Sequence, residues 1–420
     1  MEISLPSSVR KLAVLLAALL LAATYTAFTA RAYLAARFGA KPDLASLSRA
    51  CKMEPSNAEY RYLLGRYFWL IDRNPEQAAE SFRAAVSLNP HQARYWLELD
   101  AIYQFLGDTA GQADALEHAV LADPTTPEVA WEAANLYAVE GETGKALKEF
   151  RVVMENDPYL PPAALELSWR IQPDIDLLLH DVVPPIAGVY SSFLDLLIYK
   201  KETAAAAKVW AQLAQLHQPV NKGAVFNYVR YLVLNQQADQ IRLVWQQAAG
   251  PCDIAGYEPT SQNLVVNGDF SLPVLNGGLD WMYQQTPDVS LALDPTQFHG
   301  GNRSLSLVFD SRGIEDAGIR QLIPVQPNTG YEFSAFFKAD NIEGAGGPRF
   351  AIQDLYTGAS YLLSDELKDA DFWKQVNGEF VTGPDTKLLV LRIQRVPAGA
   401  AIKGRLWIDS VRLIQKSSQG

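Results

Sequence analysis

The chain has 420 residues, a formal net charge of −11 and an apolar fraction of 49%. This length suffices for two or three domains, and the apolar fraction is that of a globular chain rather than a disordered one. The acidic balance argues against nucleic acid as a partner, because phosphate binding needs a basic surface.

An uncharged, mostly apolar run occupies residues 12–30, with basic residues on both sides. A helix of this length spans roughly 30 Å, the thickness of the bilayer hydrocarbon. We predict an uncleaved transmembrane signal anchor at residues 12–30, after a cytoplasmic segment at residues 1–11. A signal peptide cleaved near Ala30-Arg31-Ala32 is the alternative. Because both flanks are basic, charge does not decide the orientation.

Three prolines, Pro90, Pro124 and Pro158, recur at a spacing of 34 residues, and each follows an Asn or Asp. A fixed period of 34 is typical of paired helices that stack into a solenoid. Small and aromatic residues recur between the prolines, namely Leu64, Gly65, Phe68, Ala78, Phe82, Ala85, Trp96, Leu99, Tyr103, Leu116, Ala119, Ala130, Tyr137, Ala146 and Phe150. These positions resemble the tetratricopeptide repeat family, and the resemblance implies an all-α solenoid that binds other proteins.

We predict the tetratricopeptide solenoid at residues 41–249. It begins with a helical lead-in and continues with three clear repeats at residues 58–158. Helical periodicity persists at residues 159–249 without the proline marks, which indicates degenerate repeats that cap the solenoid. A separate helical bundle in this last region is the alternative.

In the repeat family, fixed positions of each first helix line the concave groove. Carried onto this chain, these positions are Tyr62, Arg66, Trp69, Arg94, Leu97, Gln104, Trp131 and Asn135. Aromatic and arginine side chains are typical anchors of protein interfaces. We therefore expect a protein partner in the groove, with Trp69 and Trp131 as anchors. The alternative is that these tryptophans pack between neighbouring helices.

The composition changes at residues 250–262, which we predict to be a linker. Beyond it, short segments of alternating polarity are separated by turns rich in Gly, Asn, Asp and Pro. In one such segment Tyr331, Phe333 and Ala335 alternate with polar neighbours. The pattern predicts an all-β, two-sheet jelly-roll sandwich at residues 263–415.

Several segments of this domain occur in a recognisable order. They include Asn-Leu-Val-Val-Asn-Gly-Asp-Phe at 263–270, Gly-Leu-Asp-Trp at 278–281 and Leu-Trp-Ile-Asp-Ser-Val-Arg-Leu at 406–413. They resemble the galactose-binding-like jelly rolls of carbohydrate-binding modules of the cellulose- and xylan-binding type. The resemblance covers the whole domain and implies its fold; it implies glycan binding less strongly, because one fold carries many functions.

Sugar binding needs an aromatic platform with hydrogen-bonding groups beside it. On the outward face we expect a mixed row of Phe336, Lys338, Gln353, Arg392 and Gln394. From loops we expect Trp281, Tyr283, Tyr356, Tyr361 and Trp373 to contribute. The alternative is an ordinary solvated sheet face, with the two tryptophans in the core.

The resemblance also implies a structural calcium between the first and last strands of the jelly roll. The matching carboxylates are Asp269 and Asp409. Calcium takes several hard oxygen ligands, which a carboxylate and nearby carbonyl groups can supply. The alternative is that Asp269 caps a turn and Asp409 binds a neighbouring loop. No other cofactor is expected.

The sequence contains no hydrolase, zinc-protease, P-loop or dinucleotide-binding signature. We expect a non-catalytic protein. The pairing of a repeat solenoid with a carbohydrate-type jelly roll resembles accessory proteins of bacterial exopolysaccharide assembly and the cell envelope. This implies a single-pass inner-membrane protein whose body is extracytoplasmic or periplasmic. A pure assembly scaffold with a structural jelly roll and a glycan-active enzyme are the alternatives.

Overall fold

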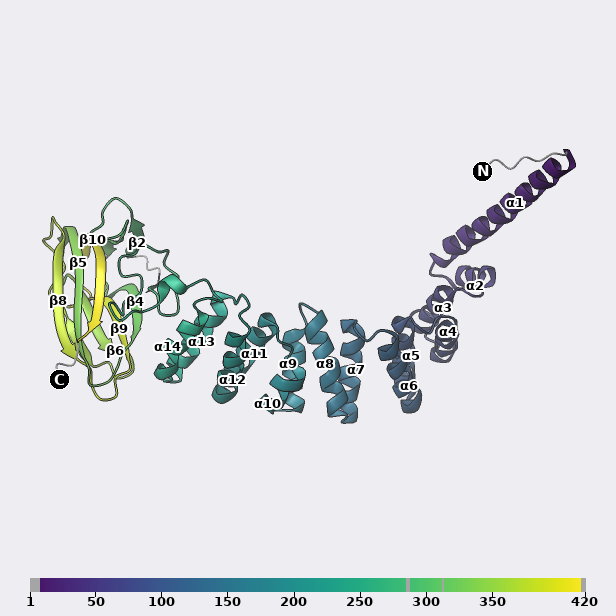
Figure 1. Cartoon of the computed structure of the whole chain (residues 1–420), viewed down its shortest axis with the longest axis horizontal. Coiled ribbons are helices and arrows are strands. Elements are labelled where there is room, and N and C mark those ends of the chain that lie inside the picture. The colour runs from purple at the N-terminus through teal and green to yellow at the C-terminus, as the bar shows by residue number, and fades with distance from the viewer. Residues whose placement is uncertain (1–7, 285–287, 312, 417–420) are drawn as a thin grey trace. The chain divides into compact units, whose positions relative to one another are not determined.

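A computed structural model describes residues 8–284, 288–311 and 313–416 of the chain (Figure 1). The chain divides into two compact units, Met1–Pro184 and Pro185–Gly420. The first unit is helical, and the second contains further helices followed by strands.

The first unit begins with α1 (Ser8–Gly39), which is exposed over most of its length. This helix is long and apolar enough to cross a membrane, by length and composition. Its last turns are buried at Ala35 and Gly39, and a side chain at Gly39 would lie 2.6 Å from the Tyr60 ring. The helix therefore continues without a break from the apolar segment to a packed contact. Helix α2 (Leu44–Met53) follows and corresponds to the expected lead-in.

Three helical hairpins come next and appear side by side in Figure 1. They are α3 (Ala58–Leu70) with α4 (Pro75–Leu88), α5 (Ala93–Leu106) with α6 (Thr109–Ala122), and α7 (Pro127–Glu140) with α8 (Thr143–Asn156). The second helix of each hairpin ends at a C-cap, Asn89, Asp123 or Asp157, directly before a periodic proline. Proline cannot continue a helix, so the 34-residue period marks the hairpin ends. The predicted tetratricopeptide-like fold is confirmed.

Small residues let the two helices of a hairpin approach closely. In the first hairpin Ala78, Phe82 and Ala85 are fully buried. A side chain at Gly65 would lie 2.7 Å from the Phe82 ring, so this glycine leaves the space that the ring fills. The unit ends with α9 (Pro161–Ile171), α10 (Ile175–Leu177) and the π-helical turn η1 (Leu178–Val182).

The second unit opens with two more helical pairs. They are α11 (Ala187–Lys200) with α12 (Thr203–Gln215), and α13 (Lys222–Leu234) with α14 (Ala238–Ala248). Both pairs lie within residues 159–249, where the sequence indicates helical periodicity.

The last helical pair packs closely against the start of the β domain. Trp245 of α14 is fully buried, and its Nε1 donates to the carbonyl of Tyr257 at 2.7 Å, in the short helix η2 (Ala255–Tyr257). A side chain at Gly278 would lie 1.9 Å from the Trp245 ring, and one at Gly277 would lie 2.4 Å from Phe226 of α13. The expected linker at residues 250–262 thus lies inside the second unit.

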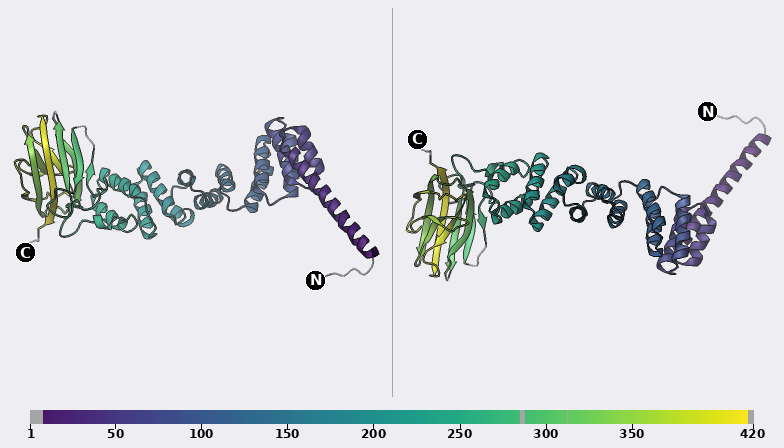
Figure 2. Two further views of the ribbon diagram at one scale, coloured as in Figure 1. Left: turned by 90° about the horizontal axis from the view of Figure 1, so that it is seen from above. Right: turned by 90° about the horizontal axis from the view of Figure 1, so that it is seen from below.

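The β domain is a sandwich of two antiparallel five-stranded sheets, as predicted (Figure 2). The first sheet has the order β1 (Met282–Tyr283), β4 (Asp316–Pro324), β9 (Leu388–Arg395), β6 (Pro348–Asp354), β7 (Ser360–Leu363). The second has the order β2 (Val289–Asp294), β3 (Ser304–Ser311), β10 (Ile402–Gln415), β5 (Gly330–Glu343), β8 (Lys374–Val381).

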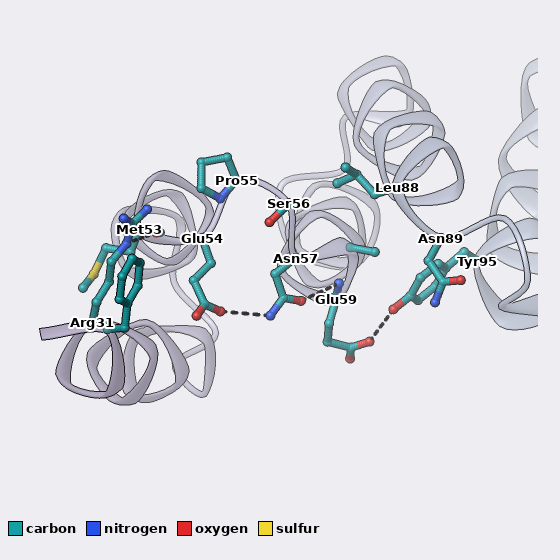
Figure 3. A pocket seen from close by; sticks show the side chains of 12 residues that line it. Arg31, Met53, Glu54, Pro55, Ser56, Asn57, Glu59, Leu88, Asn89 and Tyr95 are labelled. Atoms are coloured by element: carbon teal, nitrogen blue, oxygen red, sulfur yellow. Dashed lines mark hydrogen bonds between the residues drawn. The ribbon is translucent and has the colours of Figure 1, made fainter. Parts of the chain in front are cut away.

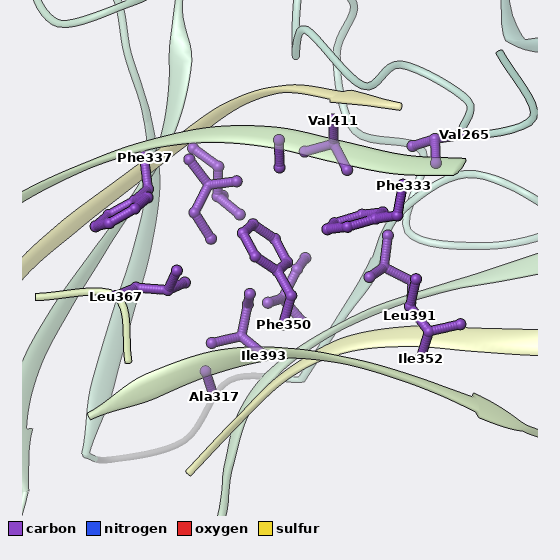
Figure 4. Packing of buried hydrophobic residues seen from close by; sticks show 14 of the residues in the cluster. Val265, Ala317, Phe333, Phe337, Phe350, Ile352, Leu367, Leu391, Ile393 and Val411 are labelled. Carbon is purple, nitrogen blue, oxygen red and sulfur yellow. The ribbon is translucent and has the colours of Figure 1, made fainter. Parts of the chain in front are cut away.

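Alternate side chains of both sheets meet in one apolar core (Figure 4). Phe333 of β5 and Phe350 of β6 meet edge to face, with ring centroids 5.2 Å apart. Leu391 and Ile393 of β9 fill the same layer. The period-2 pattern of the sequence therefore gives each strand one core face and one outward face.

One end of the sandwich is held by a buried arginine. Arg395, at the end of β9, is only 1% exposed. Its guanidinium donates to the carbonyls of Gly346 (2.8 Å), Ala400 (2.8 Å), Ala345 (3.0 Å) and Ile314 (3.2 Å). Burial lowers the pKa of this guanidinium. The side chain joins three loops that are far apart in sequence.

Candidate functional site

A cleft of about 1020 Å³ lies within the second unit, beside α13 and the outward face of the β1-β4-β9-β6-β7 sheet. Residues of α11 and α13 line one side, and residues of β1, β4 and nearby loops line the other. The polar and aromatic side chains of the lining include Asp195, Asn227, Arg230, Tyr283, Asp316 and Arg320. The cleft is therefore built by both the helical and the β parts of this unit.

The strand side of the cleft carries a dense polar network. Arg392 of β9 donates to Gln353 Oε1 of β6 at 2.7 Å and forms an ion pair with Asp316 of β4 at 3.4 Å. Arg320 of β4 lies directly opposite Arg392 in the strand register. Gln394 lies further along the same outward face, opposite Asp316. Two guanidinium groups and two side-chain amides thus gather on one sheet face.

The helix side is polar as well. Asn227 of α13 donates from Nδ2 to Asp195 Oδ1 of α11 at 2.8 Å. Arg230, one turn further along α13, donates from Nη2 to Asn227 Oδ1 at 2.7 Å. The Asn227 amide thus engages the Asp195 carboxylate. Most of the N–H donors of the Arg230 guanidinium take no part in these contacts.

An aromatic ring completes the lining. Tyr283 of β1 is 40% exposed, and its backbone N–H donates to Asn276 Oδ1 at 2.9 Å. The next residue, Gln284, donates its N–H to the carbonyl of Gly318 at 2.7 Å. An exposed ring beside amide and guanidinium groups is the combination that sugar rings and their hydroxyls bind.

The expected sugar-binding row is divided between the two sheets, which corrects the prediction of a single surface. Gln353, Arg392 and Gln394 lie on β6 and β9, whereas Phe336 and Lys338 lie on β5 of the opposite sheet. The sequence pattern identifies outward positions, but both sheets of a sandwich have an outward face. Alternation alone therefore could not assign these residues to a sheet.

On the second sheet the outward side chains contact one another. The Phe336 ring stacks on His299 with centroids 3.6 Å apart, and Trp373 meets His299 edge to face at 6.0 Å. Lys338 donates to Gln297 Oε1 at 2.9 Å and lies over the Trp407 ring at 5.7 Å. These rings and donors already have partners within the domain.

The remaining aromatic candidates occupy different environments. Trp281 is 2% exposed and stacks on Phe270 at 5.2 Å, so it belongs to the core and is corrected as a binding residue. Tyr361 stacks on Phe380 at 5.6 Å. Tyr356 is half-buried. Of these loop and edge aromatics, Tyr283 lines the cleft.

The two carboxylates expected at a calcium site hold a loop. Asp409 is fully buried and accepts backbone N–H groups of His299 (2.6 Å), Gly300 (2.9 Å) and Ser410 (2.5 Å). Asp269 accepts the hydroxyl of Ser271 at 2.9 Å. Burial raises the pKa of Asp409, against the lowering effect of these N–H groups.

This donor set does not fit a cation as it stands, because N–H groups occupy both oxygens of Asp409. Among the described residues, no group of three or more His, Cys, Asp or Glu side chains is placed to hold a metal ion. Calcium at Asp269 and Asp409, as expected from the sequence, would require these N–H groups to leave Asp409.

In the first unit, part of the expected groove is filled by its own side chains. Tyr62 is 2% exposed, with its hydroxyl donating to Glu98 at 3.2 Å and the Arg94 guanidinium 4.4 Å from its ring centroid. Arg94 pairs with Glu59 at 2.8 Å, and Arg66 with Glu98 at 3.6 Å. The structure therefore corrects Tyr62 from an open groove position to a core residue.

The expected tryptophan anchors are half-buried. Trp69 meets the exposed Phe105 edge to face at 5.1 Å, and Trp131 meets the buried Phe150 at 5.9 Å. Asn135 donates to the carbonyl of Trp131 at 2.7 Å. The other two expected positions differ in exposure: Leu97 packs in a small apolar cluster, and Gln104 is exposed.

A second, smaller pocket of about 680 Å³ lies near the C-terminal part of α1 (Figure 3). Its polar side chains bind one another. Asn57 Nδ2 donates to Glu54 at 3.0 Å, and the Tyr95 hydroxyl donates to Glu59 at 2.8 Å. Arg31 donates to the carbonyl of Met53. These pairings satisfy the lining groups internally.

Sequence reasoning missed the helix side of the cleft. Asp195, Asn227 and Arg230 lie in degenerate repeats, where nothing in the sequence pattern indicates that α13 faces the sheet. Arg320 carried a usable signal, because its outward alternation in β4 matches that of Arg392 in β9. The position of α13 depends on tertiary packing at Trp245.

The comparisons with known proteins agree with this architecture. The family model described as carbohydrate binding domain matches residues 262–399. No curated protein matches the chain.

Solved structures resemble each part of the chain separately. A CBM4 domain is 15% identical, covering 36% of this chain and 99% of its own, with a TM-score of 0.27. The CBM22-1 xylan-binding domain of Xyn10C from Paenibacillus barcinonensis is 18% identical, with coverages of 36% and 94% and a TM-score of 0.25. YrrB, a TPR protein with an unusual peptide-binding site, is 17% identical, with coverages of 41% and 75% and a TM-score of 0.25.

The chain thus joins a tetratricopeptide-like helical region to a C-terminal domain of the carbohydrate-binding type. Neither of these identified parts is a catalytic domain.

Proposed function

We propose that this protein binds a glycan in the cleft beside α13 and binds a protein partner on its repeat hairpins. It would act as a non-catalytic scaffold that brings the two together. The observation that carries the glycan assignment is the cleft itself. An exposed Tyr283 and the amide–guanidinium network around Arg392 line or adjoin it, in a domain that matches the carbohydrate-binding family.

The cleft is favoured over the outward face of the second sheet. Around the cleft, Tyr283 is exposed, and the side chain of Arg320 makes no hydrogen bond or ion pair with any residue that the structure describes, so both can meet a ligand. On the second sheet, Phe336 and Lys338 already contact His299 and Gln297. A sugar there would first have to displace these contacts.

The glycan assignment is tested by affinity electrophoresis of the full chain through gels that contain single polysaccharides. We expect retardation by at least one polysaccharide, and we expect Tyr283→Ala and Gln353→Ala to reduce it. Lys338→Ala on the opposite sheet is the matched control and should leave retardation unchanged. Loss with Lys338→Ala alone would move the site to the second sheet, and no retardation in any gel would refute glycan binding.

The protein-binding assignment follows from the hairpins, on which the half-buried Trp69 and Trp131 occupy positions that the repeat family leads us to expect in the concave groove. Interface anchors of this type cost about 2 kcal/mol or more of binding free energy when truncated. A partner captured by cross-linking in cells should therefore be lost with Trp69→Ala or Trp131→Ala while the melting temperature stays close to that of the parent. A large fall in melting temperature in both variants would identify the tryptophans as packing residues instead.

We further propose that α1 is an uncleaved anchor that keeps the body of the protein outside the cytoplasm, at the inner membrane. The support is the uninterrupted helix from the apolar run to Gly39. A role in exopolysaccharide assembly or export fits the pairing of the two domain types. N-terminal sequencing of the membrane fraction tests the anchor: a chain starting near Tyr33 would show that a signal peptidase removes the segment.

A further inference from the structure

Two arginines on the sheet beside the cleft form a cross-strand pair of like charges. Arg320 and Arg392 are directly opposite each other on neighbouring antiparallel strands. Like charges in such a cross-strand pair repel and destabilise the sheet. Asp316 and Gln353 compensate Arg392, at 3.4 Å and 2.7 Å. Within the described part of the chain, the side chain of Arg320 forms no hydrogen bond or ion pair.

A third arginine reaches the same cleft from a different element. Arg230 of α13 lines the cleft with Arg320 of β4. Its contact with the protein is to the neutral oxygen of Asn227, at 2.7 Å, so its positive charge has no carboxylate partner there. Both arginines are exposed.

The carboxylates of the cleft do not cancel these two charges. Asp316 is paired with Arg392, and Asp195 accepts the Asn227 amide at 2.8 Å. Arg392, which adjoins the cleft without lining it, balances Asp316, so the lining arginines Arg230 and Arg320 face one remaining carboxylate, that of Asp195, and leave one positive charge in excess in a chain whose overall charge is −11. A cleft of one sign attracts ligands of the other.

We propose that the cleft selects a carboxylate-bearing glycan, a chain of uronic acids, and that Arg320 and Arg230 bind its carboxylates from opposite walls. The planar guanidinium matches a carboxylate in a two-point, charge-assisted hydrogen bond, which a neutral sugar hydroxyl cannot provide. Tyr283 supplies the ring on which a sugar face rests. This inference rests on the proposed glycan binding and adds the class of glycan. It also makes α13 part of the binding site.

The test uses the full chain in detergent and measures binding to polygalacturonate, to the same polymer after methyl esterification, and to neutral cellulose and xylan oligomers. Esterification removes the charge and keeps the backbone. We expect polygalacturonate to bind at least about tenfold more tightly than its methyl ester, because a hydrogen bond to a charged group is worth more than one to a neutral group. This preference should weaken as sodium chloride is raised.

Arg320→Gln and Arg230→Gln should each weaken the affinity for polygalacturonate about tenfold. Both should leave the affinity for neutral oligomers nearly unchanged. Arg405→Gln is the matched control, because Arg405 is an exposed arginine on β10 of the opposite sheet, 5.5 Å from the Trp407 ring. Its loss changes the net charge equally but leaves the cleft intact.

The outcomes separate this inference from the proposed function. Binding to neutral oligomers with no preference for the acidic polymer would overturn the inference and keep glycan binding. If Arg405→Gln weakens binding to polygalacturonate as much as Arg320→Gln does, the preference for the acidic polymer comes from the overall charge of the chain. That result would overturn the proposed site. Binding to no polymer would refute both.

Discussion

The repeat hairpins and the sandwich bury similar apolar side chains but connect them over very different distances in the sequence. In the hairpins, Phe82 packs against Gly65 within one 34-residue unit. In the sandwich, β10 pairs with β3 and β5, so that Leu406 lies opposite Leu307 and Ala339. Each hairpin can therefore be recognised from its local sequence, and a mutation in it acts locally. The sandwich, by contrast, forms only when segments that are distant in the sequence meet.

The contrast predicts how far a destabilising mutation affects the rest of the structure. A change inside one hairpin should loosen that hairpin and its neighbours, because each repeat contacts only adjacent repeats. A change at a residue that joins distant loops of the sandwich should affect the whole domain, because small domains unfold cooperatively.

The largest effect is expected at Arg395. Arg395→Met removes the donor to four backbone carbonyls, of which that of Gly346 belongs to a buried residue. A buried acceptor left without its partner costs about 1–3 kcal/mol, and the other three lost hydrogen bonds to a charged group add to this. The melting temperature of the sandwich should fall sharply and in a single transition. Arg405→Met, at an exposed position, is the control, and an equal fall there would contradict the special role of Arg395.

Asp280 should give the next largest effect, and it depends on pH. This carboxyl is fully buried, accepts the Leu275 N–H at 2.6 Å, and burial raises its pKa from 3.8 to about 6. The folded state therefore favours the protonated form. Its contribution to stability is complete below pH 4 and is lost as the pH rises through 6.

Asp280→Asn keeps the side chain neutral at every pH. Two pKa units correspond to about 3 kcal/mol, so the variant should be more stable than the parent above pH 6 by up to that amount. Near pH 4 the two should be alike. Melting curves at pH 4 and pH 8 measure this, and a variant that is less stable at both values would refute the assignment.

A smaller and more local effect is expected at Gly65. Alanine is a better helix former than glycine by roughly 1 kcal/mol, but its methyl group would lie 2.7 Å from the buried Phe82 ring. Overpacking of this kind costs about 1–3 kcal/mol, so Gly65→Ala should be neutral to destabilising by about 2 kcal/mol.

The matched control for this change is Gly144→Ala in α8, where no atom lies within 4 Å of the added methyl group. It should stabilise by up to about 1 kcal/mol. Hydrogen exchange should show faster exchange in α3 and α4 of Gly65→Ala and unchanged exchange in the sandwich. Faster exchange in the strands would contradict the locality of the hairpins.

The smallest effect is expected from calcium. With both oxygens of Asp409 occupied by N–H groups, added calcium and added chelator should give the same melting temperature. A rise with calcium that Asp409→Ala abolishes would show that the loop at His299 rearranges to admit the ion. That outcome would restore the two-carboxylate site expected from the sequence.

The same contrast explains what the sequence could predict. The hairpin ends were predictable because Pro90, Pro124 and Pro158 mark them locally. The strands were predictable as strands, and their sheet was not, so Phe336 was grouped with Gln353 on the opposite face. Sheet membership is decided by pairing between strands that are distant along the chain.

The residues of the candidate site also divide into those that the local sequence predicts and those that depend on tertiary packing. Gln353 and Arg392 were predictable as outward polar positions beside a binding surface. Arg230 was not, because its role depends on how α13 packs against the sheet through Trp245 and Phe226. No local sequence pattern indicates a contact of this kind.

The segment between α14 and the sandwich has a practical consequence for dissecting this chain. Cys252, Ile254 and Tyr257 are buried, at 3%, 0% and 8% exposed, although most residues between them are exposed. A fragment that starts at Leu264 would lose Trp245 from above Gly278 and would expose an apolar surface. A fragment that keeps Trp245 against Gly278 starts near Pro185, where the second unit begins. Binding experiments on the carbohydrate-type domain should therefore retain the four long helices that precede it.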